Sequence, residues 1–560
     1  MEFIANNLAP IIFVAMVVFL LMGFPVAFAL GACGIFFGII GIEMGLLGPA
    51  LFQAMPDRIW GVMSNDTLLA IPFFTFMGLI LERSGMAEDL LDTIGQLFGP
   101  IRGGLAYAVI FVGAMLAATT GVVAASVISM GLISLPIMMR YGYDRRLASG
   151  VIAASGTLAQ IIPPSLVLII MADQLGRSVG DMYKGAFIPG FVLSGLYVGY
   201  VLLVTLIKPS HAPAVPMEAR TIKEKDGGNG LTSLGVLTAI SVTAAVLFSK
   251  FVLRADAPKD ETIVIGMCVG IGVAFVLAVL NKIIKADLLS NMAEKVTFVL
   301  IPPLALIFLV LGTIFLGIAT PTEGGAMGAA GALVMAISRG RLNVKLLKQA
   351  MESTTMLTAF VVFILVGARV FSLTFYGVDG HRWVEHLLTG LPGGQLGFLI
   401  VVNIMVFLLA FFLDFFELAF IVVPLLGPAA EKLGIDLIWF GVLLGVNMQT
   451  SFMHPPFGFA LFYLRSVAPQ TVKTTEIYWG AVPFVVIQCI MVALVIAFPG
   501  MVTAGLDKKV VVDESKIEII VPMEQAPAGG NPFTLDQPTG GAAGADDAAK
   551  ALEKAMGGQK

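Results

Sequence analysis

The sequence predicts an all-α polytopic membrane protein with inverted-topology repeats, two re-entrant hairpins and two broken helices. Of its 560 residues, 58% are hydrophobic and only 12% are charged, whereas a soluble domain has roughly 25% charged residues. Apolar runs long enough to cross about 30 Å of hydrocarbon recur along most of the chain. A set of helix-breaking and capping residues also occurs twice at one constant offset: Pro136, Gly142, Asp144 and Pro163-Pro164, then Pro428, Gly434, Asp436 and Pro455-Pro456.

Composition and motifs exclude several classes of function. The net charge of −4 offers no basic surface to nucleic acid. Three widely separated cysteines, Cys33, Cys268 and Cys489, lie in apolar segments and are interpreted as small core residues. There is no Walker sequence, zinc-ligand spacing or nucleophile elbow, so an ATP-driven pump is not expected. An intramembrane enzyme would need a paired catalytic constellation, for which Asp414 with His454 is the one candidate, and no enzymatic function is expected. No basic region precedes the first apolar run, which is therefore expected to be retained as a helix.

The first repeat is expected within residues 1–207. Its elements are spans at 8–23 and 25–41, an interfacial segment at 45–65, a span at 68–81, a polar connector at 82–102, an over-long apolar segment at 105–139, a broken helix at 147–171 and a span at 186–207. Thr119-Thr120-Gly121 interrupts the over-long segment, which is either two crossings or a re-entrant hairpin. We favour the hairpin, because non-helical backbone is tolerated at membrane depth only where protein buries it or water lines it.

The second repeat is expected within residues 296–505. Its elements are spans at 296–317, 320–337 and 356–376, a hairpin at 396–430 interrupted at Asp414, a broken helix at 437–464 and a span at 481–498. A polar linker and two extra spans, at 231–248 and 263–280, occupy residues 208–295. The tail, residues 506–560, is polar and expected to be largely disordered.

The charge of the loops indicates that the repeats are inverted. The loop at 140–146 has three arginines and one aspartate, whereas its counterpart at 431–436 has one lysine and two acids. Because basic loops stay in the cytoplasm, the two loops are expected on opposite faces, with the N-terminus outside.

The paired prolines predict a transport site. A broken helix at corresponding positions of two repeats is the best sequence indication of a transporter binding site. Unwinding frees carbonyl groups, which a sodium ion could bind together with the hydroxyls of Thr157, Ser165, Thr450 and Ser451. The alternative is a pair of structural proline kinks satisfied by neighbouring helices.

The hairpin tips carry further candidates. Thr119, Thr120, Gly121 and Ser126 would bring hydroxyls and exposed backbone against the first broken helix, although such hydroxyls often bond back to a carbonyl. Asp414, with Glu417, would do the same in the second half. A carboxylate within an apolar run is costly unless it is paired or functional.

Three more charged or titratable residues are candidates. Arg369 lies inside a span and would either bind an anionic substrate or pair with Asp414 or Glu323. Glu323 follows Pro321 and is expected to act at a helix N-terminus. His454 precedes the second proline pair; a packing role is favoured over proton coupling.

These residues resemble the large permease subunit of the tripartite ATP-independent periplasmic (TRAP) transporters. The resemblance covers residues 8–207 and 296–502 and rests on several short motifs. They are Leu69-Ala70-Ile71-Pro72-Phe73 with Gly78, Gly131 with Pro136, Gly142-Tyr143-Asp144, Ile161-Ile162-Pro163-Pro164-Ser165, Thr320-Pro321-Thr322-Glu323, Phe412-Leu413-Asp414, Gly434-Ile435-Asp436, Phe440-Gly441, and Pro455-Pro456 with Gly458. The insert at 208–295 makes the chain similar to the long branch associated with mannitol, chloroaromatic compounds and 2-oxo acids.

The resemblance implies an elevator-type, sodium-coupled permease of the bacterial inner membrane. It implies import of a small organic acid, a small four-helix membrane subunit and a periplasmic binding protein as partners, and no cofactor besides the coupling ion. Substrate binding is expected at Arg369, Asp414, Thr120 and Ser165. Sodium binding is expected at Thr119, Thr120, Gly121, Ser126, Thr157, Asp414, Asn447, Thr450 and Ser451. His454 stands where the family usually has threonine. The alternative is a standalone ion-coupled carboxylate transporter of the same wider superfamily, without a binding protein.

Overall fold

The computed structural model describes residues 3–4, 7–120, 123–216, 221–222, 224, 230–252, 259–284, 288–456 and 458–506. These residues belong to one compact unit, Met1–Leu506. They form helices without any strand, so the prediction of an all-α fold is confirmed. Eight helices of this described part are long and apolar enough to cross a membrane, or up to ten if each of two bent helix pairs is one span.

The first half of the chain contains ten helices in the described residues. They are α2 (Leu8–Leu21), α3 (Val26–Glu43), α4 (Met55–Met63), α5 (Ala70–Arg83), α6 (Met86–Phe98), α7 (Gly104–Thr120), α8 (Val123–Arg140), α9 (Arg145–Thr157), α10 (Leu166–Gln174) and α11 (Val179–Ile207). Helices α7 and α8 contact each other and occupy the predicted first hairpin, and α9 and α10 occupy the predicted first broken helix.

The second half follows the same plan. Its helices are α14 (Asn291–Phe315), α15 (Pro321–Ser338), α16 (Val344–Gly377), α17 (Gly380–Thr389), α18 (Gly394–Leu409), α19 (Phe415–Glu417), α20 (Val423–Lys432), α21 (Leu437–Met448), α22 (Phe459–Val467), α23 (Thr474–Ala497) and α24 (Gly500–Thr503). A π-helical stretch, Leu418–Val422, joins α19 to α20. The predicted second hairpin therefore corresponds to α18 and the continuous run α19–α20.

The constant offset between the proline pairs extends to helix boundaries. It maps the start of α8 at Val123 onto the start of α19 at Phe415, and the end of α8 at Arg140 onto the end of α20 at Lys432. The aspartates that precede the broken helices are also equivalent. Asp144 accepts hydrogen bonds from the Arg146 and Leu147 backbone nitrogens, and Asp436 accepts them from those of Ile438 and Trp439. Each repeat thus starts its broken helix with the same N-terminal cap.

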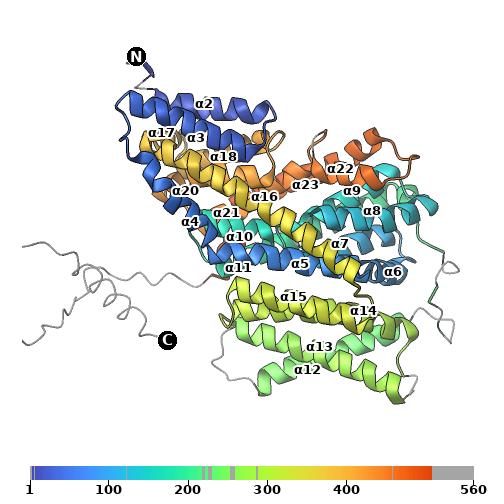
Figure 1. Cartoon of the computed structure of the whole chain (residues 1–560). Helices are drawn as coiled ribbons and strands as arrows, with labels where there is room; N and C mark the ends of the chain where they lie inside the picture. The colour runs from blue at the N-terminus through green and yellow to red at the C-terminus, as the bar shows by residue number, and fades with distance from the viewer. Residues whose placement is uncertain are drawn as a thin grey trace, which may run out of the picture. The chain divides into compact units, whose positions relative to one another are not determined.

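The N-terminal helices of the two halves interlock. Helix α3 packs against α16, and its counterpart α15 packs against α5; Figure 1 shows α16, in yellow, lying along α3 and α5. Glycines allow the closest approach. A Cβ atom added to Gly367 would lie 2.4 Å from the Ala27 carbonyl oxygen, and one added to Gly34 would lie 2.7 Å from that of Val370. Small residues at such contacts are typical of helix packing in membranes.

Helix α16 is longer than the apolar run at 356–376 predicts. It begins at Val344 rather than near Met356, because Asn343 caps it by accepting a hydrogen bond of 2.8 Å from the Leu346 nitrogen. The polar turns between residues 344 and 355 contain no helix-breaking residue, so they continue directly into the apolar span. The helix therefore extends beyond the part that hydropathy alone identifies.

The two inserted helices lie at the periphery. Helices α12 (Leu231–Phe251) and α13 (Lys259–Ile284) pack against each other and against α14, and Figure 1 shows them beside α14 and α15. In the apolar window of each, only 11% of the residues are buried. Their remaining apolar surface is suited to the lipid bilayer.

Candidate functional site

The two broken helices unwind at equivalent positions; the first break is buried throughout, and the second is buried only in part. After α9, a 3₁₀ turn at Leu158–Gln160 leads to a cis Pro163-Pro164 bond; after α21, a 3₁₀ turn at Gln449–Phe452 leads to a cis Pro455-Pro456 bond. Every residue of the first passage, 155–165, is buried. The passages differ where the helix resumes. Ser165 caps α10 by accepting a hydrogen bond of 3.5 Å from the Leu168 nitrogen, whereas Gly458, without a side chain, precedes α22.

A hydrogen-bond network joins the broken helices. The Oγ1 of Thr157 accepts hydrogen bonds from Gln449 Nε2 at 3.1 Å and from Gln488 Nε2 at 3.4 Å, and it donates one of 2.8 Å to the Ala154 carbonyl. Gln488 Nε2 also donates to the Tyr197 hydroxyl at 3.0 Å. At most 2% of the surface of each of these side chains is exposed. Thr157 thereby uses its one donor and both lone pairs within the protein.

The other predicted hydroxyl and amide ligands differ in how much bonding capacity they retain. Ser165 donates to the Gln160 carbonyl at 2.5 Å, and Thr450 donates to the Asn447 carbonyl at 2.7 Å. Both Asn447 bonds run from its Nδ2 to Asn403, to the carbonyl at 2.8 Å and to Oδ1 at 2.9 Å. The hydroxyl of Thr450 and the amide oxygen of Asn447 keep lone pairs for a cation.

Four buried side-chain oxygens near the unwound turns have no hydrogen-bond partner among the described residues. They are Ser155 Oγ and Gln160 Oε1 in the first passage and Gln449 Oε1 and Ser451 Oγ in the second. Leaving a buried polar atom unsatisfied costs about 1–3 kcal/mol. Neutral oxygens of this kind are the ligands that a hard cation such as sodium prefers, so the residues present fit the predicted ion. Of these four, only Ser451 is among the predicted ligands.

Part of the first hairpin tip lies outside the described residues. The backbone of Thr119 and Thr120 forms the last turn of α7, and Gly121 lies outside the described residues. Ser126 is buried on α8 and has a partner within the protein. Roles for these four residues in ion or substrate binding remain predictions.

The second hairpin tip is organised by Asp414. Its Oδ1 accepts a hydrogen bond of 2.9 Å from the Glu417 nitrogen, and Glu417 Oε2 accepts one of 2.9 Å from the Asp414 nitrogen. This capping box starts α19 and gives both carboxylates a local structural function. Asp414 is only partly buried, and its second carboxylate oxygen is a further potential cation ligand.

His454 connects the second broken helix to this hairpin. It is 1% exposed, and its ring stacks on Phe411 at a centroid distance of 4.1 Å and meets Phe407 edge-on at 4.4 Å. Phe407 belongs to α18, and Phe411 follows it at the tip. The imidazole therefore packs in an aromatic setting, as the sequence analysis favoured.

Arg369 lines a cavity of about 270 Å³ together with a second arginine, Arg58 of α4. The polar side chains of Gln174, Ser372 and Tyr376 complete the polar part of the wall. No carboxylate is among the lining residues, and no acid of the described residues forms an ion pair with Arg369. The predicted alternative partners are occupied elsewhere, because Glu323 forms a capping box with Thr320 and Asp414 forms one with Glu417.

The cavity lies between two groups of helices. Arg58 and Arg369 come from α4 and α16, which pack against each other. Across the cavity, Gln174 ends the second part of the first broken helix, and Phe420 and Pro424 belong to the second hairpin. An anion in this space would therefore touch the interlocked helices on one side and the hairpin and broken-helix group on the other.

Sequence reasoning missed Arg58 and the three network residues Gln449, Gln488 and Tyr197. Arg58 lies in a short amphipathic helix whose sequence is typical of a surface segment. Gln449 carries a usable signal, because it occupies the position equivalent to Thr157 in the second repeat. No comparable signal marks Gln488, the one polar side chain of the span at 481–498, or Tyr197, one of several hydroxyl side chains on the span at 186–207.

Paired helix breaks, a cavity with two arginines and helices long enough to cross a membrane are features of a membrane transporter. The sequence matches the family described as the tripartite ATP-independent periplasmic transporter, DctM component, over residues 13–501, and the chain belongs to this family. It is therefore a transporter permease, a multi-pass protein of the inner membrane, and not an enzyme, as the sequence analysis predicted.

Named relatives share most of their length with the chain. It is 26% identical over 516 residues to the C4-dicarboxylate TRAP transporter large permease protein DctM of Vibrio cholerae, covering 88% of this chain and 96% of the relative. It is 25% identical to the DctM protein of Pseudomonas aeruginosa, covering 81% and 90%. The sialic acid permease SiaT of Haemophilus influenzae is 23% identical, with 80% of this chain and 61% of SiaT covered. Among solved structures, the YdaH transporter of Alcanivorax borkumensis aligns with a TM-score of 0.47 and 15% identity, over 80% of this chain and 88% of that one.

Proposed function

We propose that this chain is the permease of a sodium-coupled importer of small organic acids. A periplasmic binding protein delivers the acid, and a small four-helix membrane subunit completes the membrane complex. The observation that carries the proposal is the cavity with Arg58 and Arg369. Two guanidinium groups with no carboxylate partner among the described residues favour an anion, and the planar guanidinium matches a carboxylate with two parallel hydrogen bonds.

The names of several relatives support an organic anion as cargo. The relatives in Vibrio cholerae and Pseudomonas aeruginosa are named for C4-dicarboxylates, SiaT is named for sialic acid, and a permease of Oleidesulfovibrio alaskensis is named for isethionate. All of these compounds carry a carboxylate or sulfonate. Within this class, two arginines in one cavity favour a substrate with two anionic groups.

The unpartnered oxygens at the two broken helices support sodium as the coupling ion. In the first half, the unpartnered oxygens of Ser155 and Gln160 would hold an ion with freed carbonyls. In the second half, the unpartnered Ser451 oxygen would do so with the remaining lone pairs of Thr450 and Asn447. A bound cation supplies positive charge beside the path of an anion. It would also satisfy oxygens that otherwise remain unpaired within the core.

The position of the cavity supports an elevator mechanism. In this mechanism the hairpins and broken helices, α7–α10 and α18–α22, slide as one body past the interlocked helices α3, α5, α15 and α16. The Thr157–Gln449 bond would keep the two halves of the sliding body together. The substrate would be carried between the two groups of helices, where Arg369 and Gln174 face the same cavity.

Reconstitution tests the proposal. The full chain is placed in liposomes with and without the small subunit and the binding protein, and uptake of radiolabelled C4-dicarboxylate, sialic acid and isethionate is measured with sodium or potassium outside. We expect uptake of at least one acid that requires both partners and an inward sodium gradient. Uptake by the chain alone would support a standalone carboxylate transporter instead, and uptake that is equal in potassium would contradict sodium coupling.

A further inference from the structure

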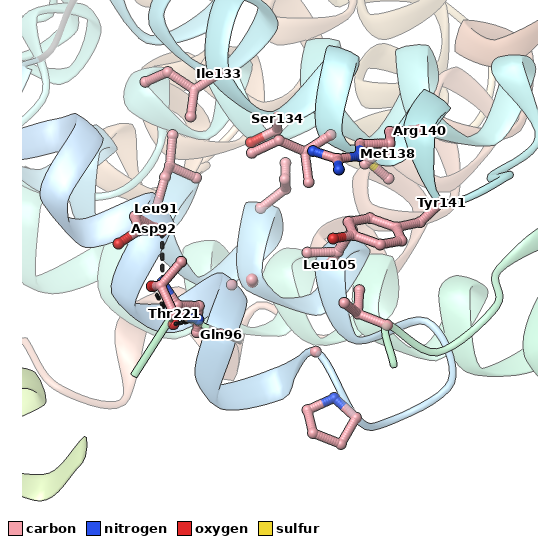
Figure 2. Close-up of a pocket in the computed structure, with 17 residues that line it drawn as sticks. Leu91, Asp92, Gln96, Leu105, Ile133, Ser134, Met138, Arg140, Tyr141 and Thr221 are labelled. Atoms are coloured by element: carbon pink, nitrogen blue, oxygen red, sulfur yellow. Dashed lines mark hydrogen bonds between the residues drawn. The ribbon is translucent and has the colours of Figure 1, made fainter. Parts of the chain in front are cut away.

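A second cavity lies at the base of the first hairpin, away from the broken helices. Its volume is about 230 Å³, and α6, α7, α8 and the segment after α11 form its walls. Figure 2 shows Arg140 and Tyr141 at one end and Asp92, Gln96 and Thr221 at the other. Most of the wall between them is apolar, as in a site for an amphipathic molecule.

The segment after α11 closes the cavity as a strap, defined here as residues 209–215 and 221–222. The Gly103 nitrogen donates to the Ala212 carbonyl at 2.9 Å, and the Val215 nitrogen donates to the Gly99 carbonyl at 2.8 Å. Gln96 Oε1 accepts hydrogen bonds from the Thr221 nitrogen, the Thr221 hydroxyl and the Ile222 nitrogen, at 2.9–3.2 Å. The strap is therefore hydrogen-bonded to α6 and to the loop that follows it.

Charges at the two ends of the cavity differ. Asp92 is engaged by Lys295 Nζ at 3.1 Å and by Gln96 Nε2 at 2.7 Å, which compensates its charge. Arg140 has no acidic partner among the described residues and lies with its guanidinium carbon 6.0 Å from the Tyr141 ring centroid. The net charge that faces the cavity is thus the positive charge of Arg140.

The cavity also borders surface suited to lipid. Ile137 lines it and is 37% exposed, and the neighbouring apolar side chains Ile101 and Leu132 are 50% and 56% exposed. Arg140 begins the arginine-rich loop that is expected in the cytoplasm, so the cavity would lie at the level of the inner-leaflet headgroups. Basic pockets between helices on this side of a membrane bind anionic lipid headgroups.

We infer that this cavity binds an anionic phospholipid, with its phosphate at Arg140 and an acyl chain leaving over Ile137. The lipid would touch α6, the first hairpin and the strap at once. It would therefore stabilise the contact between the hairpin base and α6. This inference does not depend on the substrate or the coupling ion.

Lipid binding to the purified full chain in neutral detergent tests the inference. Binding of radiolabelled dioleoyl phosphatidylglycerol is measured, with dioleoyl phosphatidylcholine and inorganic phosphate as competitors. We expect phosphatidylglycerol to bind and neither competitor to displace it. Arg140→Gln should weaken its binding about tenfold, since a hydrogen bond to a charged group is worth about one decade or more in affinity. Arg146→Gln, an exposed arginine of the same loop that does not line the cavity, is the matched control and should bind normally.

A second variant tests the cavity without changing charge. Gly95 lines the cavity, and a Cβ atom added there would meet only Leu105 Cδ2, at an ordinary 3.6 Å. Gly95→Met should therefore fill the space, leave the fold intact and weaken phosphatidylglycerol binding as strongly as Arg140→Gln. Normal binding by both variants would overturn the inference, as would equal displacement by phosphatidylcholine. Displacement by inorganic phosphate would assign the cavity to free phosphate instead of lipid.

Discussion

Thr157 and Gln449 occupy equivalent positions of the two repeats, and a hydrogen bond of 3.1 Å joins their side chains. The bond therefore links the two broken helices directly at the point where each one unwinds. Because Thr157 donates its hydrogen to the Ala154 carbonyl, it can only accept from Gln449, which fixes the orientation of the glutamine amide. The pair provides a direct connection between the two halves of the proposed moving body.

Removing the threonine hydroxyl should destabilise the chain through this connection. Thr157→Val leaves the buried Gln449 and Gln488 amides without their shared acceptor and should cost about 1–3 kcal/mol. Gln449→Leu should be less than additive with it, since the two residues share one bond. Thermal unfolding of the single and double variants in detergent measures the coupling. A double variant equal to the sum of the singles would show that the bond carries no energy.

Substitutions of Asp414 in the capping box can distinguish its structural function from a function in ion binding. Asparagine caps a helix about as well as aspartate, so Asp414→Asn should fold with stability close to the wild type. Asp414→Ala should lose about 1 kcal/mol. If the carboxylate also binds sodium, Asp414→Asn should lose sodium stimulation of uptake despite its normal fold. Unchanged sodium dependence of that variant would restrict Asp414 to the cap.

The contact between α9 and α23 depends on glycine. A Cβ atom added to Gly150 would lie 2.1 Å from the Gly480 carbonyl oxygen. Gly150→Ala should therefore separate the helices and cost about 1–3 kcal/mol or more, as overpacking does. Gly195→Ala in α11 is the control, because nothing lies within 4 Å of its added Cβ atom. Its effect on the melting temperature should be small, and equal destabilisation by both would contradict the packing argument.

We expect Arg58 to bind the second anionic group of a substrate in the cavity. Arg58→Gln should weaken uptake of a C4-dicarboxylate about tenfold while changing uptake of a monocarboxylate of similar size much less. Transport assays with the two acids measure this ratio. An equal loss for both would assign Arg58 a general electrostatic effect rather than a contact with the second carboxylate.

The sequence predicted the repeat and its breaks because prolines, glycines and capping aspartates control the backbone locally. The constant offset from Pro136 to Pro163 carries through to the boundaries of α8 and the α19–α20 run. Local pattern also identified the N-terminal role of Glu323. These features depend on neighbours along the chain, which a sequence displays directly.

Tertiary contacts were harder to predict. The hydroxyl of Thr157, a predicted sodium ligand, is bonded to Ala154, Gln449 and Gln488, which lie on three elements. Arg58 lines the same cavity as Arg369 because α4 packs on α16, and hydropathy does not reveal this contact. Contacts between residues that are far apart in the sequence can be identified only once the fold is known.

Arg369 gives the most direct test of the central claim that this cavity binds the transported anion. Uptake is compared in liposomes that contain the partners and wild type, Arg369→Gln or the control Arg382→Gln, an exposed arginine of α17 outside the cavity. We expect normal membrane insertion for all three and a loss of uptake of about tenfold or more for Arg369→Gln alone. Wild-type uptake by Arg369→Gln at every substrate concentration would contradict that claim.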